Sequence, residues 1–178
     1  DQQMREWAVF RLDLERDLHR ALERRELLLH YQPKVDLGTG AVIGVEALLR
    51  WNHPARGMVS PADFIPVAEE TGLIVPIGRW VLEQAAAQSA RWRRAGVHPA
   101  VPIAVNLSAH QLADPALPAE VTQALMRADA VPTDVIIEIT ESAVLQDVDG
   151  ATARLQSLRE MGIKVSIDDF GTGYSSLS

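Results

Sequence analysis

The sequence predicts a mixed α/β fold in which strands and helices alternate along most of the chain. Short runs rich in valine, isoleucine and leucine recur between longer segments whose apolar residues have helical spacing. This alternation is typical of parallel βα units. At 178 residues, with 47% hydrophobic and 23% charged residues, the chain is long enough to bury one sizeable core.

The first expected element is an amphipathic helix over residues 5–26. Its apolar residues recur at roughly helical spacing between acids and bases, and they are Leu12, Leu14, Leu18, Ala21 and Leu22. A helix at this place is equally compatible with the first element of a domain and with the end of a linker from an upstream module. We therefore divide the chain into an N-terminal helix, 1–26, and a domain, 27–178.

A pair of strands should follow this helix. Leu27–Val35 and Val42–Leu49 are β-like runs, and the intervening residues 36–40 (DLGTG) have the composition of a hairpin turn. Because so short a connection joins only antiparallel neighbours, the sequence predicts that the first two strands pair in opposite directions.

The remaining helices and strands alternate. Ser60 and Pro61 suit the cap and the first position of a helix, and Gly72 and Gly96 suit the ends of two helices. The expected helices cover residues 61–70, 77–94, 118–128 and 151–161, and the expected strands cover residues 101–107, 135–139 and 163–167.

Five strands are compatible with two architectures, an open doubly wound sheet and a (β/α) barrel. The pattern Gly-x-Gly-x-x-Gly, which marks dinucleotide-binding doubly wound sheets, does not follow the early strands. A full barrel has eight strands in about 250 residues. On the barrel interpretation, we therefore expect this chain to be incomplete.

Composition narrows the possible functions. The net charge is −7, from 24 acidic and 17 basic residues, whereas proteins that bind polymeric nucleic acid usually present a basic face. The chain has no cysteine, which excludes disulfides and thiolate metal sites and fits a cytoplasmic location. It has no apolar run of about 18 residues, so we expect no membrane segment in this chain.

Oxygen-bearing side chains occupy the ends of four expected strands. Glu46, Asn106 and Glu138 alternate with aliphatic neighbours, and Asp168 and Asp169 close the last strand. The carboxyl ends of parallel strands are where α/β proteins build their sites. Gathered carboxylates raise one another's pKa or require a cation, and oxygen ligands without Cys or His suit Mg²⁺ or Mn²⁺. The adjacent aspartates could serve two neighbouring ions.

Each of these residues also has an ordinary interpretation. A lone glutamate in a strand is more often exposed or ion-paired than a metal ligand, an asparagine at a strand end is usually a turn former, and paired aspartates before a glycine often only solvate a loop. Arg50 could simply neutralise the acids. The shared placement on four strands is what favours a metal site.

The sequence around these residues resembles the EAL family of bacterial cyclic di-GMP phosphodiesterases. A three-letter match alone has little specificity, but six blocks in order across nearly the whole chain are very specific. The blocks are residues 31–33 (YQP), 46–51 (EALLRW), 61–72 (PADFIPVAEETG), 106–108 (NLS), 138–141 (EITE) and 168–177 (DDFGTGYSSL).

The resemblance implies a fold, a TIM-like (β/α) barrel with an antiparallel first strand, whose C-terminal strands are missing from this chain. Residues 27–178 would be a partial phosphodiesterase domain. Family members continue beyond the last block with a lysine on the next strand, then a glutamate and a glutamine. The lysine and the glutamate complete the arrangement around the attacking water.

The resemblance also implies roles for individual residues. Gln32 and Arg50 would contact the ligand, and the planar guanidinium of Arg50 suits a phosphate. Glu141 would hold the loop Phe170–Ser176, which links dimerisation to activity in the family. Metal ligation would fall to five residues, of which the glutamate at 46 and the two aspartates are also catalytic: Glu46, Asn106, Glu138, Asp168 and Asp169.

The function implied is metal-dependent hydrolysis of cyclic di-GMP to linear pGpG in bacterial second-messenger signalling, with two Mg²⁺ or Mn²⁺ ions per site. The expected partners are a second copy of the chain, paired through the region of Phe170–Ser176, and an upstream sensor or diguanylate cyclase domain. Two alternatives stay open: a catalytically inactive sensor that binds cyclic di-GMP, and a protein-interaction module.

Overall fold

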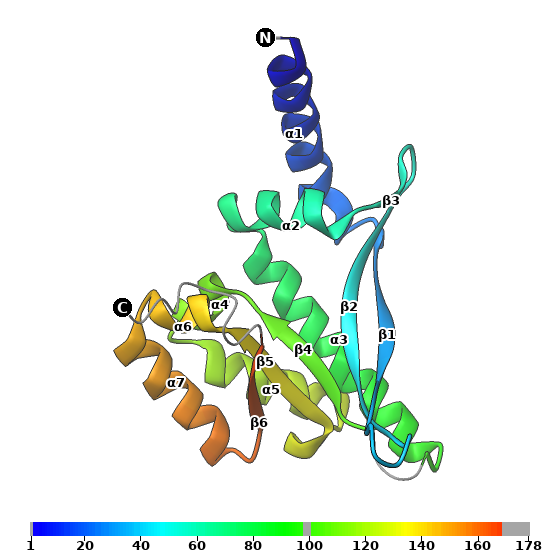
Figure 1. The fold of residues 1–178 in the computed structure, drawn as a ribbon, viewed down its shortest axis with the longest axis vertical. Coiled ribbons are helices and arrows are strands. Elements are labelled where there is room, and N and C mark those ends of the chain that lie inside the picture. Colours follow the sequence, from blue (N-terminus) through cyan, green and yellow to red (C-terminus); the bar gives the residue numbers. More distant parts are fainter. Residues whose placement is uncertain (1, 98–100, 169–178) are drawn as a thin grey trace.

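One curved sheet organises the part of the chain that the structure, a computed structural model, describes: residues 2–97 and 101–168, with side chains from residue 9 onward. Helices alternate with the strands, so the predicted mixed α/β class is confirmed (Figure 1).

The order of the strands in the sheet follows their order in the chain. β1 (Leu27–Val35) pairs antiparallel with β2 (Val42–His53), which confirms the predicted hairpin. β2, β4 (Ile103–Leu107), β5 (Val135–Thr140) and β6 (Lys164–Asp168) then pair in parallel, in that sequence. A doubly wound sheet reverses its order at a switch point, whereas a barrel does not. The described strands therefore form part of the wall of a barrel, as an arc and not a closed ring.

The sheet curls toward its polar face. On a flat sheet, the backbones of Lys34 on β1 and Glu138 on β5 would be about 14 Å apart across three strand spacings, and the register places them a further four residues, about 13 Å, apart along the strands. In the structure, Lys34 Nζ lies only 2.5 Å from Glu138 Oε1. Such a contact requires the two strands to face one another across a concave surface.

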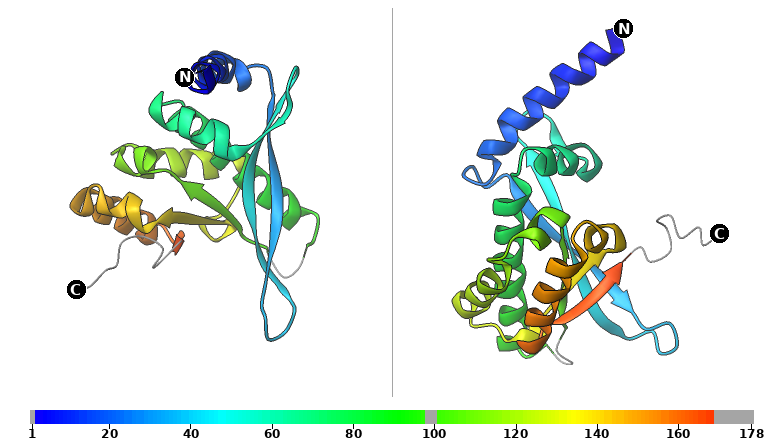
Figure 2. Two further views of the ribbon diagram at one scale, coloured as in Figure 1. Left: turned by 45° about the horizontal axis from the view of Figure 1, so that its top comes forward. Right: turned by 90° about the vertical axis from the view of Figure 1, so that its left-hand side faces the viewer.

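The outer, convex face of the sheet is apolar and covered by helices. α3 (Ile74–Arg94), α5 (Leu117–Ala128) and α7 (Val148–Glu160) follow one another in a row, with α3 against α5 and α5 against α7 (Figure 2). Successive side chains of a strand point to opposite faces. On β4, for example, Ile103 and Val105 are buried on the outer face.

The hairpin turn between β1 and β2 is held by local hydrogen bonds. Asp36 Oδ1 accepts from the backbone N–H groups of Gly38 and Thr39, and from Thr39 Oγ1. The hydrogen bonds from Thr39, and then that from Gly38, hold the pKa of the Asp36 carboxyl below its usual value. Residues 36–40 (DLGTG) indicate a hairpin because the Asp36 side chain can form these turn-stabilising contacts.

Most element bounds differ from the predicted ones by one to five residues. The N-terminal helix α1 (Gln2–Ala21) ends before residue 26, α7 begins at Val148 instead of residue 151, and β4 begins at Ile103 instead of residue 101. α3 begins at Ile74 instead of residue 77, because Pro76 lies in the first helical turn, where no backbone N–H is needed. β2 extends beyond residue 49 and pairs with a short additional strand, β3 (Gly57–Val59). By contrast, α2 (Pro61–Glu70) has the predicted bounds, and Gly72 and Gly96 adopt the left-handed conformation expected where helices end, each with φ of 75°.

Three short helical elements are not predicted by periodicity: α4 (Ala109–Ala113), η1 (Pro132–Asp134) and α6 (Glu141–Leu145). Five residues or fewer are too few to show a 3.6-residue period. Their only sequence signals are caps. Ser108 Oγ accepts from the N–H of Gln111, and Thr140 Oγ1 accepts from that of Ala143.

The N-terminal helix α1 (Gln2–Ala21) belongs only partly to the core. Leu14 and Leu18 are buried together with the sheet residues, but Leu12, which the periodicity placed on the apolar face, is 66% exposed. The first turns extend beyond the rest of the described chain (Figure 1). The division of the chain at residue 26 stays a prediction. Among the described residues, no helix combines the length and apolar character needed to cross a membrane.

A buried histidine ties α1 to the strand that carries Glu46. His53, at the end of β2, accepts hydrogen bonds at Nδ1 from the backbone N–H groups of Ala55 and Arg56. Because Nδ1 accepts, the proton of the neutral ring is on Nε2, which lies 3.2 Å from Asp17 Oδ2 of α1. The contact accounts for this histidine without a role in the site chemistry.

Candidate active site

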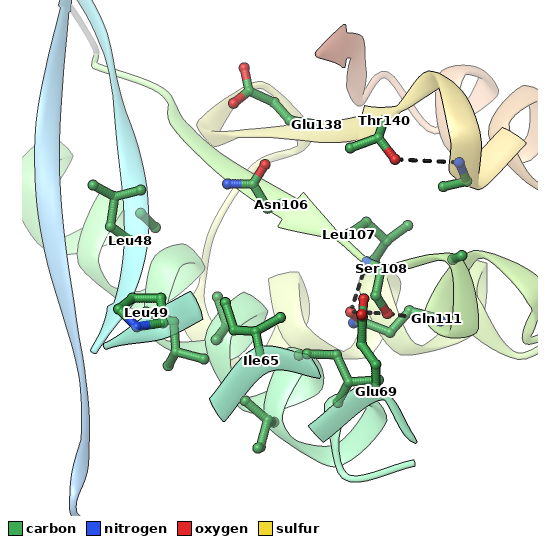
Figure 3. Close-up of a pocket in the computed structure, with 18 of the residues that line it drawn as sticks. Leu48, Leu49, Ile65, Glu69, Asn106, Leu107, Ser108, Gln111, Glu138 and Thr140 are labelled. Carbon is green, nitrogen blue, oxygen red and sulfur yellow. Dashed lines mark hydrogen bonds between the residues drawn. The ribbon is translucent and has the colours of Figure 1, made fainter. Parts of the chain in front are cut away.

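A cavity of about 430 Å³ opens at the carboxyl ends of β2, β4 and β5. Figure 3 shows its two walls. Asn106, Glu138 and Thr140, from the ends of β4 and β5, form a polar wall, and Leu48 and Ile65, from β2 and α2, belong to an apolar wall. Its volume lies in the range of cavities that hold small-molecule ligands. The carboxyl ends of the strands, where the sequence predicted a site, do surround a cavity.

Glu46 and Asn106 meet at this edge of the sheet. Asn106 Nδ2 donates a hydrogen bond of 2.7 Å to Glu46 Oε1, although the two residues are 60 positions apart in the chain. The parallel register makes this possible, because Glu46 stands beside Ala104, one inward-facing position before Asn106. Two of the predicted ligands are therefore in direct contact.

Glu138 stands beside Asn106 in the register of β4 and β5, and it is buried, with 7% of its surface exposed. Lys34 Nζ contacts its Oε1 at 2.5 Å. Its Oε2 is buried and has no hydrogen-bond partner among the described residues. An unsatisfied buried polar atom costs about 1–3 kcal/mol, and more when it is charged. Because this oxygen needs a further partner, Glu138 fits the chemistry of a cation ligand.

The positions of three further predicted site residues follow from the strand register and from the bounds of α6. Asp168 ends β6 beside Thr140 and is exposed. Gln32 stands opposite Glu46 on β1, also exposed. Glu141 is the half-buried first residue of α6.

Asp169 and the loop Phe170–Ser176, which Glu141 was expected to hold, lie outside the described residues. In the described part of the chain, no three His, Cys, Asp or Glu residues lie close enough together to hold a metal ion. Asn106 is not among these residue types, although its amide oxygen can also bind a cation. The predicted ligand set thus stays a prediction.

Arg50 lines the cavity and is half-buried. Its Nη1 donates to the carbonyl oxygen of Leu49 at 2.9 Å, and it forms no ion pair with the carboxylates of the described residues. The interpretation in which Arg50 neutralises the acidic cluster thus has no direct ionic contact behind it within the described residues. Most of its hydrogen-bonding capacity remains available to a ligand.

Sequence reasoning missed three residues near the site. Lys34 shares the inward face of β1 with Gln32, a placement that the two-residue period could have indicated. Glu69 lies on α2, to which the sequence assigned no site residue, yet it lines the cavity. Gln111 also lines it, and its Oε1 accepts from the N–H and the hydroxyl of Ser108. Figure 3 shows Glu69 on the same side of the cavity as Ser108 and Gln111.

Comparison with known proteins gives consistent matches. The sequence model of the EAL domain matches residues 15–178. Over 170 residues, 96% of this chain and 25% of the relative, the chain is 52% identical to the bifunctional diguanylate cyclase/cyclic di-GMP phosphodiesterase MucR of Pseudomonas aeruginosa. Over 165 residues, 93% of this chain and 24% of the relative, it is 44% identical to the cyclic di-GMP phosphodiesterase PdeR of Escherichia coli.

Solved structures agree with the sequence matches. A structure titled PaMucR phosphodiesterase, c-di-GMP complex, has a TM-score of 0.87 and 52% identity, and the match covers 92% of this chain and 66% of that one. The chain spans about a quarter of the length of the curated relatives that it matches.

Proposed function

The chain belongs to the EAL domain family, and on this premise we propose that it hydrolyses one phosphodiester bond of cyclic di-GMP to give linear pGpG. The observation that carries the proposal is the buried Oε2 of Glu138, which has no partner in the part of the chain that the structure describes. It lies beside Asn106, which is hydrogen-bonded to Glu46, at the cavity on the carboxyl edge of the sheet. The names of the relatives MucR and PdeR support the choice of cyclic di-GMP as the substrate.

Two divalent cations, Mg²⁺ or Mn²⁺, would activate a water molecule and offset the charge of the phosphate when held by Glu46, Asn106, Glu138, Asp168 and Asp169. The ligand chemistry supports this part of the proposal, since all five side chains offer oxygen atoms. Glu46 and Asn106 orient one another through their hydrogen bond. Glu138 stands beside Asn106 in the register and would offer its Oε2 atom to a cation.

The remaining residues bind and orient the substrate. The guanidinium of Arg50 would take a phosphate oxygen pair through two parallel N–H groups, and the amide of Gln32 would contribute a further hydrogen bond. Leu48, Leu49 and Ile65 line the cavity and offer an apolar surface to a guanine base. Arg50 matters for charge as well, because an anionic substrate approaches a chain with a net charge of −7.

Assembly is part of the same proposal. Two copies would pair through the region of Phe170–Ser176, with Glu141 supporting that loop, and a sensor or diguanylate cyclase domain would precede the helix α1. Sedimentation of the longest natural polypeptide that contains this sequence, with and without cyclic di-GMP, tests the pairing. A monomer in both states would contradict it. The cytoplasmic location stays a prediction.

A hydrolysis assay tests the proposed activity. The longest natural polypeptide that contains this chain is incubated with cyclic di-GMP and Mn²⁺, and pGpG is measured by chromatography. We expect Glu46→Gln to lower kcat/KM by about 100-fold or more, because the loss of a metal ligand exceeds the 10- to 100-fold effect of outer-shell changes.

Glu160→Gln, the same change on the exposed surface of α7, is the matched control and should leave hydrolysis unchanged. Activity that survives Glu46→Gln would contradict the ligand assignment. Tight binding of cyclic di-GMP with no pGpG from the parent protein would favour the inactive sensor instead.

A further inference from the structure

We propose that Lys34 is an internal counter-ion for Glu138, which a divalent cation has to displace before it can use that carboxylate fully. The inference rests on the proposed function and deepens it, because it names a residue that sets the metal affinity of the same site.

The ion pair is asymmetric in its exposure. The side chain of Lys34 is 36% exposed and that of Glu138 is 8% exposed, with Nζ and Oε1 2.5 Å apart. A lysine has a long and flexible side chain that can carry its ammonium group into water. The glutamate side chain is shorter and is buried in the protein. The pair can therefore open by movement of Lys34, but only if another cation takes over the buried charge of Glu138.

Glu138 lies between two cavities. The first is the candidate active site, and the second, of about 160 Å³, lies closer to the amino ends of the strands, where Ala104 and Ile136 precede Asn106 and Glu138 by one inward position. Of these two cavities, Lys34 lines the lower one and not the candidate active site. Its contact therefore draws Oε1 toward the lower cavity and away from the edge at which the predicted metal ligands gather.

Electrostatics gives the direction in which Lys34 changes the metal affinity of the site. Lys34 and a divalent cation have the same sign of charge and compete for one carboxylate, so a cation bound at Glu138 is repelled by Lys34 as long as the lysine stays in place. Removing the positive charge at position 34 should strengthen metal binding. A lysine that merely oriented Glu138 as an outer-shell partner would have the opposite effect, since loss of such partners weakens metal binding about 10- to 100-fold.

Titration with Mn²⁺ tests the proposal without any substrate. The paramagnetic resonance signal of free Mn²⁺ gives the dissociation constant for the longest natural polypeptide that contains this chain. We expect Lys34→Gln, which keeps a hydrogen-bond donor for Oε1 but has no charge, to lower the Mn²⁺ dissociation constant at least tenfold. Lys34→Arg, which keeps the charge, should stay within about threefold of the parent.

A matched control separates the effect of losing the Lys34–Glu138 contact from the effect of changing the net charge. Lys164 lines the same lower cavity and is exposed, so Lys164→Gln removes one positive charge at a comparable place without removing the Lys34–Glu138 contact. We expect it to change the Mn²⁺ dissociation constant less than threefold. An equal gain in Lys164→Gln and Lys34→Gln would overturn the proposal, because net charge alone would then explain the result.

A second readout is the melting temperature in EDTA. Lys34→Met should melt below the parent without metal, because it leaves Glu138 buried and unpaired, and should gain more from saturating Mn²⁺ than the parent does. Unchanged or weaker Mn²⁺ binding by Lys34→Gln overturns the proposal while the proposed function stands. Absence of Mn²⁺ binding in the parent and all variants overturns both.

Discussion

The two faces of β4 and β5 are built on opposite principles. On the outer face, Ile103 and Ile137 are completely buried against the helices. On the inner face, the same strands carry Asn106, which is exposed, and Glu138, which is buried with one oxygen that has no partner among the described residues. The outer face of these strands thus serves stability, and the inner face carries the predicted ligands toward the carboxyl ends.

This difference separates two kinds of substitution. Changes on the outer face remove packing and should lower the free energy of unfolding. Changes at exposed predicted ligands on the inner face, such as Asn106, should lower ligand or metal binding with little loss of stability, as is common at functional sites. The predictions below test this separation, beginning with the largest effect.

The outer face can be tested with two isoleucines that are neighbours in the chain. Ile137 is fully buried on the outer face, and Ile136 is partly buried on the inner face. We expect Ile137→Ala to lower the free energy of unfolding by about 3–4 kcal/mol, within the usual range for a buried isoleucine, as measured by urea denaturation. Ile136→Ala should lower it by less than half as much. Equal losses would contradict the assignment of the two faces.

The inner face can be tested at Asn106. Asn106→Ala removes the donor to Glu46 and one predicted ligand, so we expect Mn²⁺ affinity and kcat/KM to fall by about 10- to 100-fold. The free energy of unfolding should change by less than about 1 kcal/mol, as for most exposed positions. A loss of stability similar to that of Ile137→Ala would show that Asn106 is a packing residue.

The rim of the cavity can be tested at Gly78 of α3. A Cβ atom added there would lie 2.0 Å from Nε2 of Gln111, which is buried and held by Ser108. Gly78→Ala should therefore lower the free energy of unfolding by about 1–2 kcal/mol through overpacking, and should weaken binding of cyclic di-GMP. Gly38→Ala, in the hairpin turn, meets only Asp36 Oδ1 at 3.4 Å and should change stability much less.

A subtler test concerns the shape of the cation at position 50. Arg50→Lys keeps the charge but removes the planar pair of donors, so the dissociation constant for cyclic di-GMP should rise by about three- to tenfold while stability stays unchanged. Isothermal titration with cyclic di-GMP measures this dissociation constant, with Arg50 and Arg50→Lys compared in a Glu46→Gln background that is catalytically impaired. Unchanged affinity would mean that Arg50 contributes only charge.

The smallest expected effect is at the start of α7, in a local helix cap and not on either face of the sheet. A hydrogen bond from Arg154, and then one from the N–H of Gly150, hold the pKa of the Asp147 carboxyl below its usual value. A depressed pKa stabilises the fold above the unfolded-state pKa and is lost as pH falls through the folded-state pKa. Asp147→Asn should lower the melting temperature slightly at pH 7, and the difference should vanish in acid. A difference that persists in acid would contradict this origin.

Local chemistry made much of the fold predictable. The bounds of β1 and α2 were predicted residue for residue, because a DLGTG turn and a Ser60–Pro61 helix start are signalled by adjacent residues. The choice between an open sheet and a barrel was not, since it depends on which strands pair across the sheet. The family resemblance implied a barrel, and the strand order among the described residues agrees with it.

The candidate site was predictable in type but not in its contacts. Alternation along β2, β4 and β5 indicated which side chains share the inner face, and the Glu46–Asn106 hydrogen bond agrees with that placement. The Lys34–Glu138 pair was not predictable, because it depends on the curvature of the sheet, which no local pattern encodes. The role of Asp169 stays a prediction.

The contact between Lys34 and Glu138 also has a consequence for the order of folding. It joins residues 104 positions apart, and the two side chains meet only once β1, β2, β4 and β5 are all in place, so it should form late, after most loop-closure entropy has been lost. Interactions absent from the transition state slow unfolding and leave the folding rate unaltered. The buried carboxylate would then stay hydrated for most of the folding reaction and become dehydrated only when its lysine arrives.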